Sequence, residues 1–358
     1  RRHPMRRPLV ATALAAAAPV FAAGPAASKP LRGTSQGDIL FTYYLGHGDT
    51  KNVILLPSSL RECFDFGYMA LDLADTLQTP IFVLSDLDLG MNNWMSEPFE
   101  YPAEPIKRGK VLSAADVAER GFARYKDIDG DGIPYRTLPG NEHPLAAYFA
   151  RGTGHNDNAV YSERPDDWKN NMARLARKFD TARNLVPGPV VDETAGAEIG
   201  IIAYGTTRPA IEEARDRLAA DGIPTNFMRL RALPINHEVE AFIERHDRVY
   251  VIEMNRDGQM HTLLRSELPE LATRLESLAL LDGMPLTARW VAEAVIAAEE
   301  ERPRRRSAYG QGKRGATELD LPGDGSLSPG NGMPRGDSGL TDMGHDGHNR
   351  EVLMGEIQ

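Results

Sequence analysis

The sequence has almost none of the residue type that forms covalent cross-links and sulfur-ligated metal centres. Its 358 residues include a single cysteine, Cys63. One cysteine excludes a disulfide within the chain, a cysteine-based zinc site and an iron–sulfur cluster held by this chain alone. Cys63 lies in a helix-like apolar pattern, so we expect a small buried side chain there.

An excess of positive charge is also missing. The chain has 51 acidic and 41 basic residues and a formal net charge of −10. Because nucleic-acid phosphates bind to basic surfaces, this balance argues against nucleic acid as a partner. The hydrophobic share of 41% is ordinary for a soluble globular protein, and the length is sufficient for two domains.

Long hydrophobic runs are scarce as well. The apolar stretch near the start, residues 9–24, is too short and too rich in alanine to indicate a transmembrane helix. With Arg6 and Arg7 before it and Ala22 and Ala23 near its end, it imitates a secretory signal peptide, which is the alternative interpretation. We predict instead that residues 1–33 are a non-homologous or disordered segment, because the rest has the pattern of a cytosolic α/β enzyme. The predicted location is cytoplasmic, without a membrane partner.

The chain is organised around residues 78–94, Q-T-P-I-F-V-L-S-D-L-D-L-G-M-N-N-W. The apolar run at residues 81–84 is typical of a strand covered on both faces, as in a parallel sheet. Asp86, Asp88 and Asn92 follow at its carboxyl end, where open α/β sheets bind their ligands. We therefore select these three residues as candidates for a ligand-facing site. The alternative is that the two aspartates only cap a turn.

This strand completes a predicted βαβ unit. Residues 52–56 form its first strand, and a helix runs from Ser59 to about residue 77, with Glu62 placed for a capping box. The unit predicts a parallel sheet with a right-handed crossover.

A long irregular region, residues 97–165, follows the unit and is typical of a functional or interfacial loop. It contains D-I-D-G-D-G, residues 127–132, which matches the first half of an EF-hand calcium loop. The second half does not match, because Leu138 stands where a bidentate glutamate is needed. We therefore predict a structural turn and no metal site.

The segment R-G-T-G-H-N-D-N, residues 151–158, offers a second candidate site. Its glycines permit a tight backbone path, and His155 and Asn156 provide polar contacts. A solvated surface loop is the alternative. The next helix, residues 166–185, carries a stripe that indicates a core or interface, not a cofactor site: Trp168, Met172, Leu175 and Phe179.

The remaining chain divides by composition into a linker, a second domain and a tail. Residues 34–185 form the first predicted α/β domain and residues 186–196 the linker. Residues 197–300 alternate strands and helices, which predicts a second parallel α/β domain. Residues 301–358 lack apolar periodicity, so we expect a disordered tail, in which His345 and His348 are solvated.

Several motifs together resemble a known family. They are T-S-Q-G-D-I-L-F, L-P-S-S-L-R-E-C-F-D, F-V-L-S-D-L-D-L-G-M-N-N-W, D-I-D-G-D-G-I-P-Y-R-T-L-P-G, R-G-T-G-H-N, I-I-A-Y-G-T-T and V-I-E-M-N-R-D-G-Q-M. Over residues 34–290 the chain resembles the alpha subunit of 2-oxoacid:ferredoxin oxidoreductases, especially the 2-oxoglutarate type.

The resemblance implies a fold, a reaction and partners. The fold would be a partial thiamine-diphosphate pyrimidine-binding domain followed by a domain similar to the transketolase C-terminal domain. The reaction would convert a 2-oxoacid and coenzyme A to acyl-CoA and CO₂, with electrons passing to ferredoxin. A beta subunit would supply the diphosphate–Mg²⁺ site and an iron–sulfur cluster, which fits the single cysteine of this chain.

The family has a motif similar to R-x-G-P-S-T-G-x-P-T-[RK]-T-x-Q, which helps to hold the 2-oxoacid. This chain departs from the family at that motif. Only Thr34, Ser35 and Gln36 remain of it, and the glutamate that activates the thiamine ring is absent. We therefore assign no catalytic residue to the chain and expect it to be inactive alone. Thr34 joins the other candidates that face substrate or cofactor. A non-catalytic structural or interaction subunit is the alternative function, and the sequence leaves open which 2-oxoacid is used.

Overall fold

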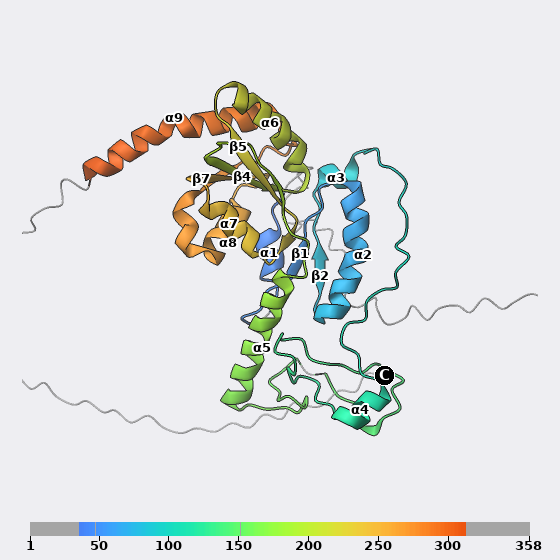
Figure 1. Ribbon diagram of the computed structural model, residues 1–358. Helices are drawn as coiled ribbons and strands as arrows, with labels where there is room; N and C mark the ends of the chain where they lie inside the picture. Colours follow the sequence, from blue (N-terminus) through green and yellow to red (C-terminus); the bar gives the residue numbers. More distant parts are fainter. Residues whose placement is uncertain (1–35, 47, 151, 313–358) are drawn as a thin grey trace, which may run out of the picture. The chain divides into compact units, whose positions relative to one another are not determined.

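The computed structural model of the protein describes residues 36–46, 48–150 and 152–312, with side chains as far as Arg302 (Figure 1). The described residues up to Arg305 belong to one compact unit, which contains every element below except the end of α9. The predictions for residues 1–33, Thr34, His345 and His348 fall outside the described residues. None of the helices in the described part of the chain combines the length and the apolar character needed to cross a membrane.

The first half of the chain builds a small sheet covered by one long helix. Its elements are α1 (Ile39–Tyr43), β1 (Val53–Leu55), α2 (Leu60–Leu77), β2 (Ile81–Val83) and α3 (Leu87–Met91). Strands β1 and β2 pair in parallel, with Val53 opposite Ile81, so the predicted βαβ unit is confirmed. Strand β2 lies at the sheet edge, and Phe82 and Val83 are only half-buried, contrary to the expectation of a fully covered strand.

Helix α2 shows how local sequence sets this unit. Ser59 caps it by accepting a hydrogen bond from the Glu62 backbone N–H at 3.2 Å. The predicted capping box is only half formed, because the Glu62 carboxylate accepts from Ser58 N–H at 2.9 Å and not from Ser59. Apolar residues three or four positions apart turn one helix face toward the sheet: Phe66, Ala70, Leu73 and Leu77.

The region before the next long helix is irregular, as predicted. Its described residues form two short helices, α4 (Ala114–Arg120) and η1 (Pro144–Ala146). Helix α5 (Pro165–Arg183) then buries a stripe that differs in part from the predicted one. Trp168 is 55% exposed, whereas Arg174 and Lys178 are buried. Of the predicted stripe, Phe179 is buried in the core and Met172 and Leu175 are half-buried, so the prediction fails only at Trp168. Apolar periodicity alone did not indicate that this helix also buries polar and charged side chains.

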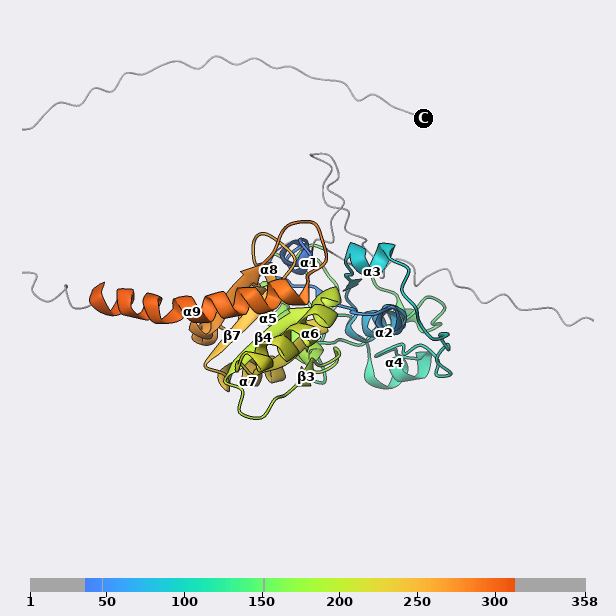
Figure 2. The same cartoon turned by 90° about the horizontal axis from the view of Figure 1, so that it is seen from above.

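The second half of the chain forms a five-stranded sheet with helices on both faces (Figures 1 and 2). Its elements are β3 (Val190–Asp192), β4 (Ile199–Tyr204), η2 (Gly205–Thr207), α6 (Arg208–Ala220), β5 (Thr225–Leu230), β6 (Ala232–Leu233), α7 (His237–Glu244), β7 (Arg248–Glu253), α8 (Gln259–Glu267), η3 (Pro269–Arg274), β8 (Leu275–Ala279) and α9 (Ala288–Gly312). The order is β3-β5-β4-β7-β8, and all pairs are parallel except β3 with β5. The predicted parallel α/β arrangement is confirmed.

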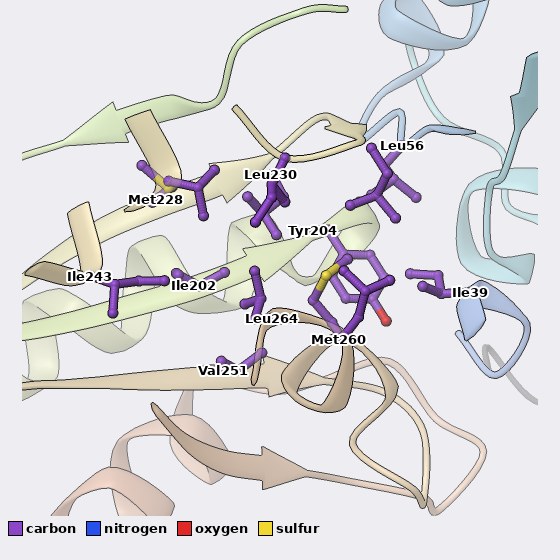
Figure 3. Close-up of a cluster of buried hydrophobic side chains, with 14 of the residues drawn as sticks. Ile39, Leu56, Ile202, Tyr204, Met228, Leu230, Ile243, Val251, Met260 and Leu264 are labelled. Carbon is purple, nitrogen blue, oxygen red and sulfur yellow. The ribbon is translucent and has the colours of Figure 1, made fainter. Parts of the chain in front are cut away.

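Successive residues of the central strands point to opposite faces, and each face has its own core. Ile202 and Tyr204 pack with Ile243 of α7 and Leu264 of α8 (Figure 3). Ile201, on the same strand, packs on the other face with residues of α6 and α9. This two-sided burial explains why β4 reads as a continuous apolar run.

The two halves share one sheet. Strand β6 pairs antiparallel with β1, with Ile54 opposite Leu233. Strand β3 lies inside the predicted linker and pairs with β5. Helix α9 continues to Gly312, into the segment expected to be disordered. The division into two domains therefore stays a prediction.

Candidate functional site

A buried polar cluster lies beyond the carboxyl ends of β2 and β4. Asp86, which is 8% exposed, accepts hydrogen bonds at Oδ2 from Thr206 Oγ1 at 2.6 Å and from Thr206 N at 3.3 Å. Its other carboxylate oxygen accepts from Leu89 N at 3.1 Å and so caps α3. Asp86 therefore does cap the turn, but it also fastens the loop after β2 to the start of the Gly-Thr-Thr segment.

Gln36, the first residue that the structure describes, completes this cluster. Its Nε2 donates to Asp86 Oδ2 at 3.3 Å and to Tyr204 O at 3.1 Å. Its Oε1 accepts from Met254 N at 3.1 Å, beyond the end of β7. One glutamine side chain thus connects the ends of three strands. Gly205, with φ of +65°, leaves the space that this side chain fills, since a Cβ there would lie 2.8 Å from Gln36 Nε2.

Glu253, the last residue of β7, is fully buried beside the cluster. It accepts hydrogen bonds from Asn255 Nδ2 at 2.6 Å and Tyr204 Oη at 3.2 Å. It also accepts from the backbone amides of Met260 and His261 at 2.9 and 3.1 Å, at the first turn of α8. Burial, with Glu253 nearby, holds the pKa of the Tyr204 hydroxyl well above its usual range, so this hydroxyl stays a proton donor.

Asp88 and Asn92, the next two predicted residues, contact each other. Asn92 Nδ2 donates to the Asp88 carboxylate, and Trp94 Nε1 donates to the Asp88 carbonyl oxygen at 2.8 Å. Burial and the neighbouring charge of Asp86 raise the pKa of the Asp88 carboxyl. In the described chain, the Asp88 carboxylate has no hydrogen bond from a backbone amide or a basic residue, unlike the carboxylates of Asp86 and Glu253.

His155 and Asn156 belong to a second group, next to α5. His155 is 9% exposed, and its ring stacks on Tyr125 with 3.8 Å between ring centroids. Asn171 Nδ2 donates to His155 O at 2.6 Å. Asn156 Oδ1 accepts from Asn158 N at 3.0 Å and Val160 N at 3.2 Å, which closes a local turn. The glycine-flanked segment therefore buries His155 but leaves Gly152, Thr153, Asp157 and Asn158 exposed, so its role in a site stays a prediction.

The structure does not join these two groups. No hydrogen bond or ion pair of the described chain connects residues 86–92 with residues 155–156. Figure 1 shows α3 at one end of α2 and the region of α4 beyond the other end. That all five residues face one substrate or cofactor stays a prediction.

Sequence reasoning missed a buried ion-pair cluster between the two halves. The Glu62 carboxylate accepts two hydrogen bonds from the Arg229 guanidinium, both at 2.8 Å, and one from Arg231 Nε at 3.0 Å. These contacts with Arg229 and Arg231, together with a hydrogen bond from Ser58 N–H, outweigh the opposing effect of burial and lower the pKa of Glu62 to about 2. The available signal was the arginine within the strand at residues 225–230.

The calcium-like loop holds a cation that comes from the protein itself. Lys110 Nζ lies 2.6 Å from Asp129 Oδ2 and 2.7 Å from Asp131 Oδ2, and it donates to Ile133 O at 3.0 Å. Asp127 instead accepts from the amides of Gly130 and Gly132. No group of three or more His, Cys, Asp or Glu side chains in the described residues is arranged to hold a metal.

We expect Lys110→Met to lower the melting temperature by several degrees, because it leaves two neighbouring carboxylates without their cation. Differential scanning calorimetry would measure it, with Lys107→Met, an exposed lysine of the same segment, as the control. Calcium should not stabilise the unmodified chain. A clear calcium-induced rise in its melting temperature would contradict the assignment of Lys110 as the occupant.

Three histidines should make the fold sensitive to acid. Burial lowers the pKa of His155, His246 and His261 below the ordinary 6.5. Below about pH 6.5 the unfolded chain therefore binds protons that the folded chain does not, so stability falls as the pH drops toward the folded pKa values. Urea unfolding at about pH 7.5 and at about pH 5.5, on either side of the ordinary histidine pKa, would measure this loss of stability. His246→Gln should show a shallower fall, and an unchanged slope would contradict the expectation.

Comparison with known proteins supports the resemblance stated from the motifs. A scan against models of protein families finds no match. The chain is 29% identical over 280 residues to 2-oxoacid:ferredoxin oxidoreductase 2, subunit alpha, of Aeropyrum pernix, covering 76% of this chain and 42% of that protein. It is 27% identical over 240 residues to 2-oxoglutarate synthase subunit KorA of Methanothermobacter thermautotrophicus, covering 66% of this chain and 61% of that protein.

A solved structure shows the same fold. The 2-oxoglutarate:ferredoxin oxidoreductase from Magnetococcus marinus superposes with a TM-score of 0.65 at 24% identity, over 76% of this chain and 46% of that one. These similarities confirm the resemblance to alpha subunits of 2-oxoacid:ferredoxin oxidoreductases and the predicted fold class. The chain spans less than two thirds of the length of the curated relatives described here.

Proposed function

We propose that this chain is the alpha-subunit body of a thiamine-diphosphate-dependent 2-oxoacid:ferredoxin oxidoreductase. The proposed reaction converts a 2-oxoacid, in the first place 2-oxoglutarate, and coenzyme A to acyl-CoA and CO₂, with two electrons passing to ferredoxin. The observation that supports it most is the similarity to the Aeropyrum pernix alpha subunit over 280 residues. The share of that protein covered, 42%, leaves the whole activity a proposal.

The role of the described residues is to position loops at the strand ends. The Asp86 carboxylate and the Gln36 amide bind the loop after β2, the turn after β4 and the residue after β7 to one another. Such buried networks hold loops rigid because each polar group would cost free energy if its partner moved away. We propose that they fix the face on which substrate and cofactor are bound in the complex.

In the part of the chain that the structure describes, two buried glutamates and the one cysteine do not fit a cofactor site. The buried carboxylates of Glu62 and Glu253 are saturated by arginines and backbone amides, and neither is free to bond an aminopyrimidine ring. Cys63 is a half-buried thiol whose pKa burial raises to about 11, so it stays protonated and is unsuited to ligate iron. We propose that the beta subunit holds the iron–sulfur cluster and the diphosphate–Mg²⁺ site.

A second candidate function is a structural subunit without chemistry of its own. The saturation of Glu62 and Glu253 favours it, since neither can move a proton without losing partners. The two candidates differ in one respect: a structural subunit assembles with its partner but does not respond to substitution of its own polar loops.

Kinetics of two variants would test the proposal. In the intact enzyme that carries this body, with its beta subunit, Asp88→Asn and His155→Ala should each lower kcat/KM for the 2-oxoacid at least about tenfold, or about 1.4 kcal/mol. The measurement is 2-oxoacid-dependent reduction of an electron acceptor. Asp65→Asn, which removes only an exposed pair with Arg61, is the matched control. Unchanged kinetics in both site variants, with the complex assembled, would leave these residues a structural role only.

A further inference from the structure

Three cationic side chains gather between α5 and the irregular region that precedes it. Arg174 and Lys178 lie four residues apart on one face of α5 and are 8% and 7% exposed. Arg124, in the loop after α4, joins them, and the guanidinium carbons of Arg124 and Arg174 lie 5.0 and 5.6 Å from the centroid of the same Tyr125 ring. Buried positive charges in such a group repel each other and are costly to desolvate.

The described chain supplies no anion that pairs with them. Lys178 has neither a hydrogen bond nor an ion pair within the described residues, and its Nζ lies 5.8 Å from the centroid of the Phe179 ring. Arg174 makes one long hydrogen bond, to Gly132 O at 3.4 Å, while its Nε has no partner. In Arg124, both Nε and Nη1 are buried without an acceptor. Three buried guanidinium nitrogens therefore lack the acceptors that buried donors normally have, and the Lys178 ammonium finds none among the described residues.

The nearest carboxylates, those of Asp127 and Asp157, do not pair with the three cations. Asp127 pairs with Arg177 at 3.0 Å and accepts hydrogen bonds from two backbone amides of its own loop. Asp157 is close enough to act on the pKa of Arg174 but forms no ion pair with it in the described structure. Burial, and then the charges of Arg174 and Arg124, lower the pKa of Lys178 to about 8. No carboxylate offsets these effects, as expected for a cluster of cations without a counter-charge.

We propose that Arg124, Arg174 and Lys178 form a binding site for an oxyanion, either a phosphoryl group or a carboxylate. A guanidinium offers a planar pair of N–H donors that matches oxyanion geometry, and the ammonium adds a third direction. Because Arg174 and Lys178 are more than nine-tenths buried, we expect the ligand to be a small anion or the end of a larger molecule. The proposal is independent of the proposed reaction, since it concerns binding by this chain alone.

The test is thermal unfolding of the full chain in a buffer without phosphate, with inorganic phosphate added in one series and succinate in the other. At about ten times the dissociation constant, the bound anion should raise the melting temperature by roughly 3 °C. A response to phosphate identifies a phosphoryl site, and a response to succinate alone identifies a carboxylate site. No response to either anion would overturn the proposal.

Three variants make the test specific. Arg174→Met and Lys178→Met should lose the anion response, while Lys169→Met, an exposed lysine on the same helix, should keep it. Without anion, Lys178→Met should melt no lower than the unmodified chain, because it removes an unpaired buried charge. A fall of several degrees in that variant, or a response that survives both cluster variants, would show that the cluster is not an anion site.

Discussion

Gly132→Ala is expected to destabilise the protein by roughly 2–5 kcal/mol, from a strained backbone and a collision with α5. Gly132 has a φ of +78°, which side chains of L-residues rarely adopt. A Cβ would lie 2.5 Å from Arg174 O and 2.8 Å from Lys178 Cα. Both atoms are backbone atoms of a regular helix, so neither can move without breaking helical hydrogen bonds. The loop and α5 therefore depend on this glycine for their close approach.

The matched control is Gly130→Ala, two residues earlier in the same loop. Gly130 has nearly the same φ, +77°, but a Cβ there meets nothing within 4 Å. The Gly130→Ala variant should lose only the stability that corresponds to backbone strain, about 1–2 kcal/mol. Urea unfolding of the two variants separates the collision from the strain. Equal losses would contradict the close packing of the loop on α5.

Glu62→Gln is the second change with a large expected effect, a loss of about 3 kcal/mol. It removes the charge that pairs with Arg229 and Arg231, and the Arg229 side chain is only 5% exposed. The remaining guanidinium cannot easily return to water, and this uncompensated buried charge is the source of the cost. Because this ion pair joins α2 to β5, the loss should appear as reduced global stability in urea unfolding.

Glu213→Gln controls for the loss of a surface charge. Glu213 pairs with Arg217 one helical turn away, and both side chains are at least half exposed, so the change should stay within about 0.5 kcal/mol. The pH dependence gives a further check. The folded pKa of Glu62, about 2, lies below the ordinary 4.5, so its contribution is present above about pH 4.5 and is lost as the pH falls toward 2. A Glu62→Gln variant as stable as the control would contradict the buried pair.

Local signals in the sequence were sufficient for the elements that carry their own pattern. Strand β4 is an apolar run, and α6 begins with Pro209 in its first turn, so the sequence of both elements indicates a strand followed by a helix. Strand β6 could not be predicted, because two residues, Ala232 and Leu233, become a strand only through pairing with β1. Strand β3 was taken for linker for the same reason: its pairing with β5 gives it order.

The sequence was sufficient to place candidate site residues after a strand, but not to predict which residues they would contact. Asp86 was found from its place after a strand, yet its bond to Thr206 depends on how two distant segments meet. The acidic loop was recognised as an incomplete calcium loop, but nothing in its own residues indicates that Lys110 occupies it. The cations Arg174 and Lys178 were overlooked because charged residues on a helix usually face solvent.

The central claim, that this chain is the body of an alpha subunit, is tested most directly by reconstitution with a beta subunit. The intact protein that carries this body would be purified together with that subunit, and 2-oxoglutarate-dependent reduction of methyl viologen would be measured with coenzyme A present. We predict a stable complex whose reduction rate saturates with 2-oxoglutarate and requires both chains. A complex that assembles without any 2-oxoacid-dependent reduction would favour the structural subunit, and failure of the two chains to associate would contradict the account.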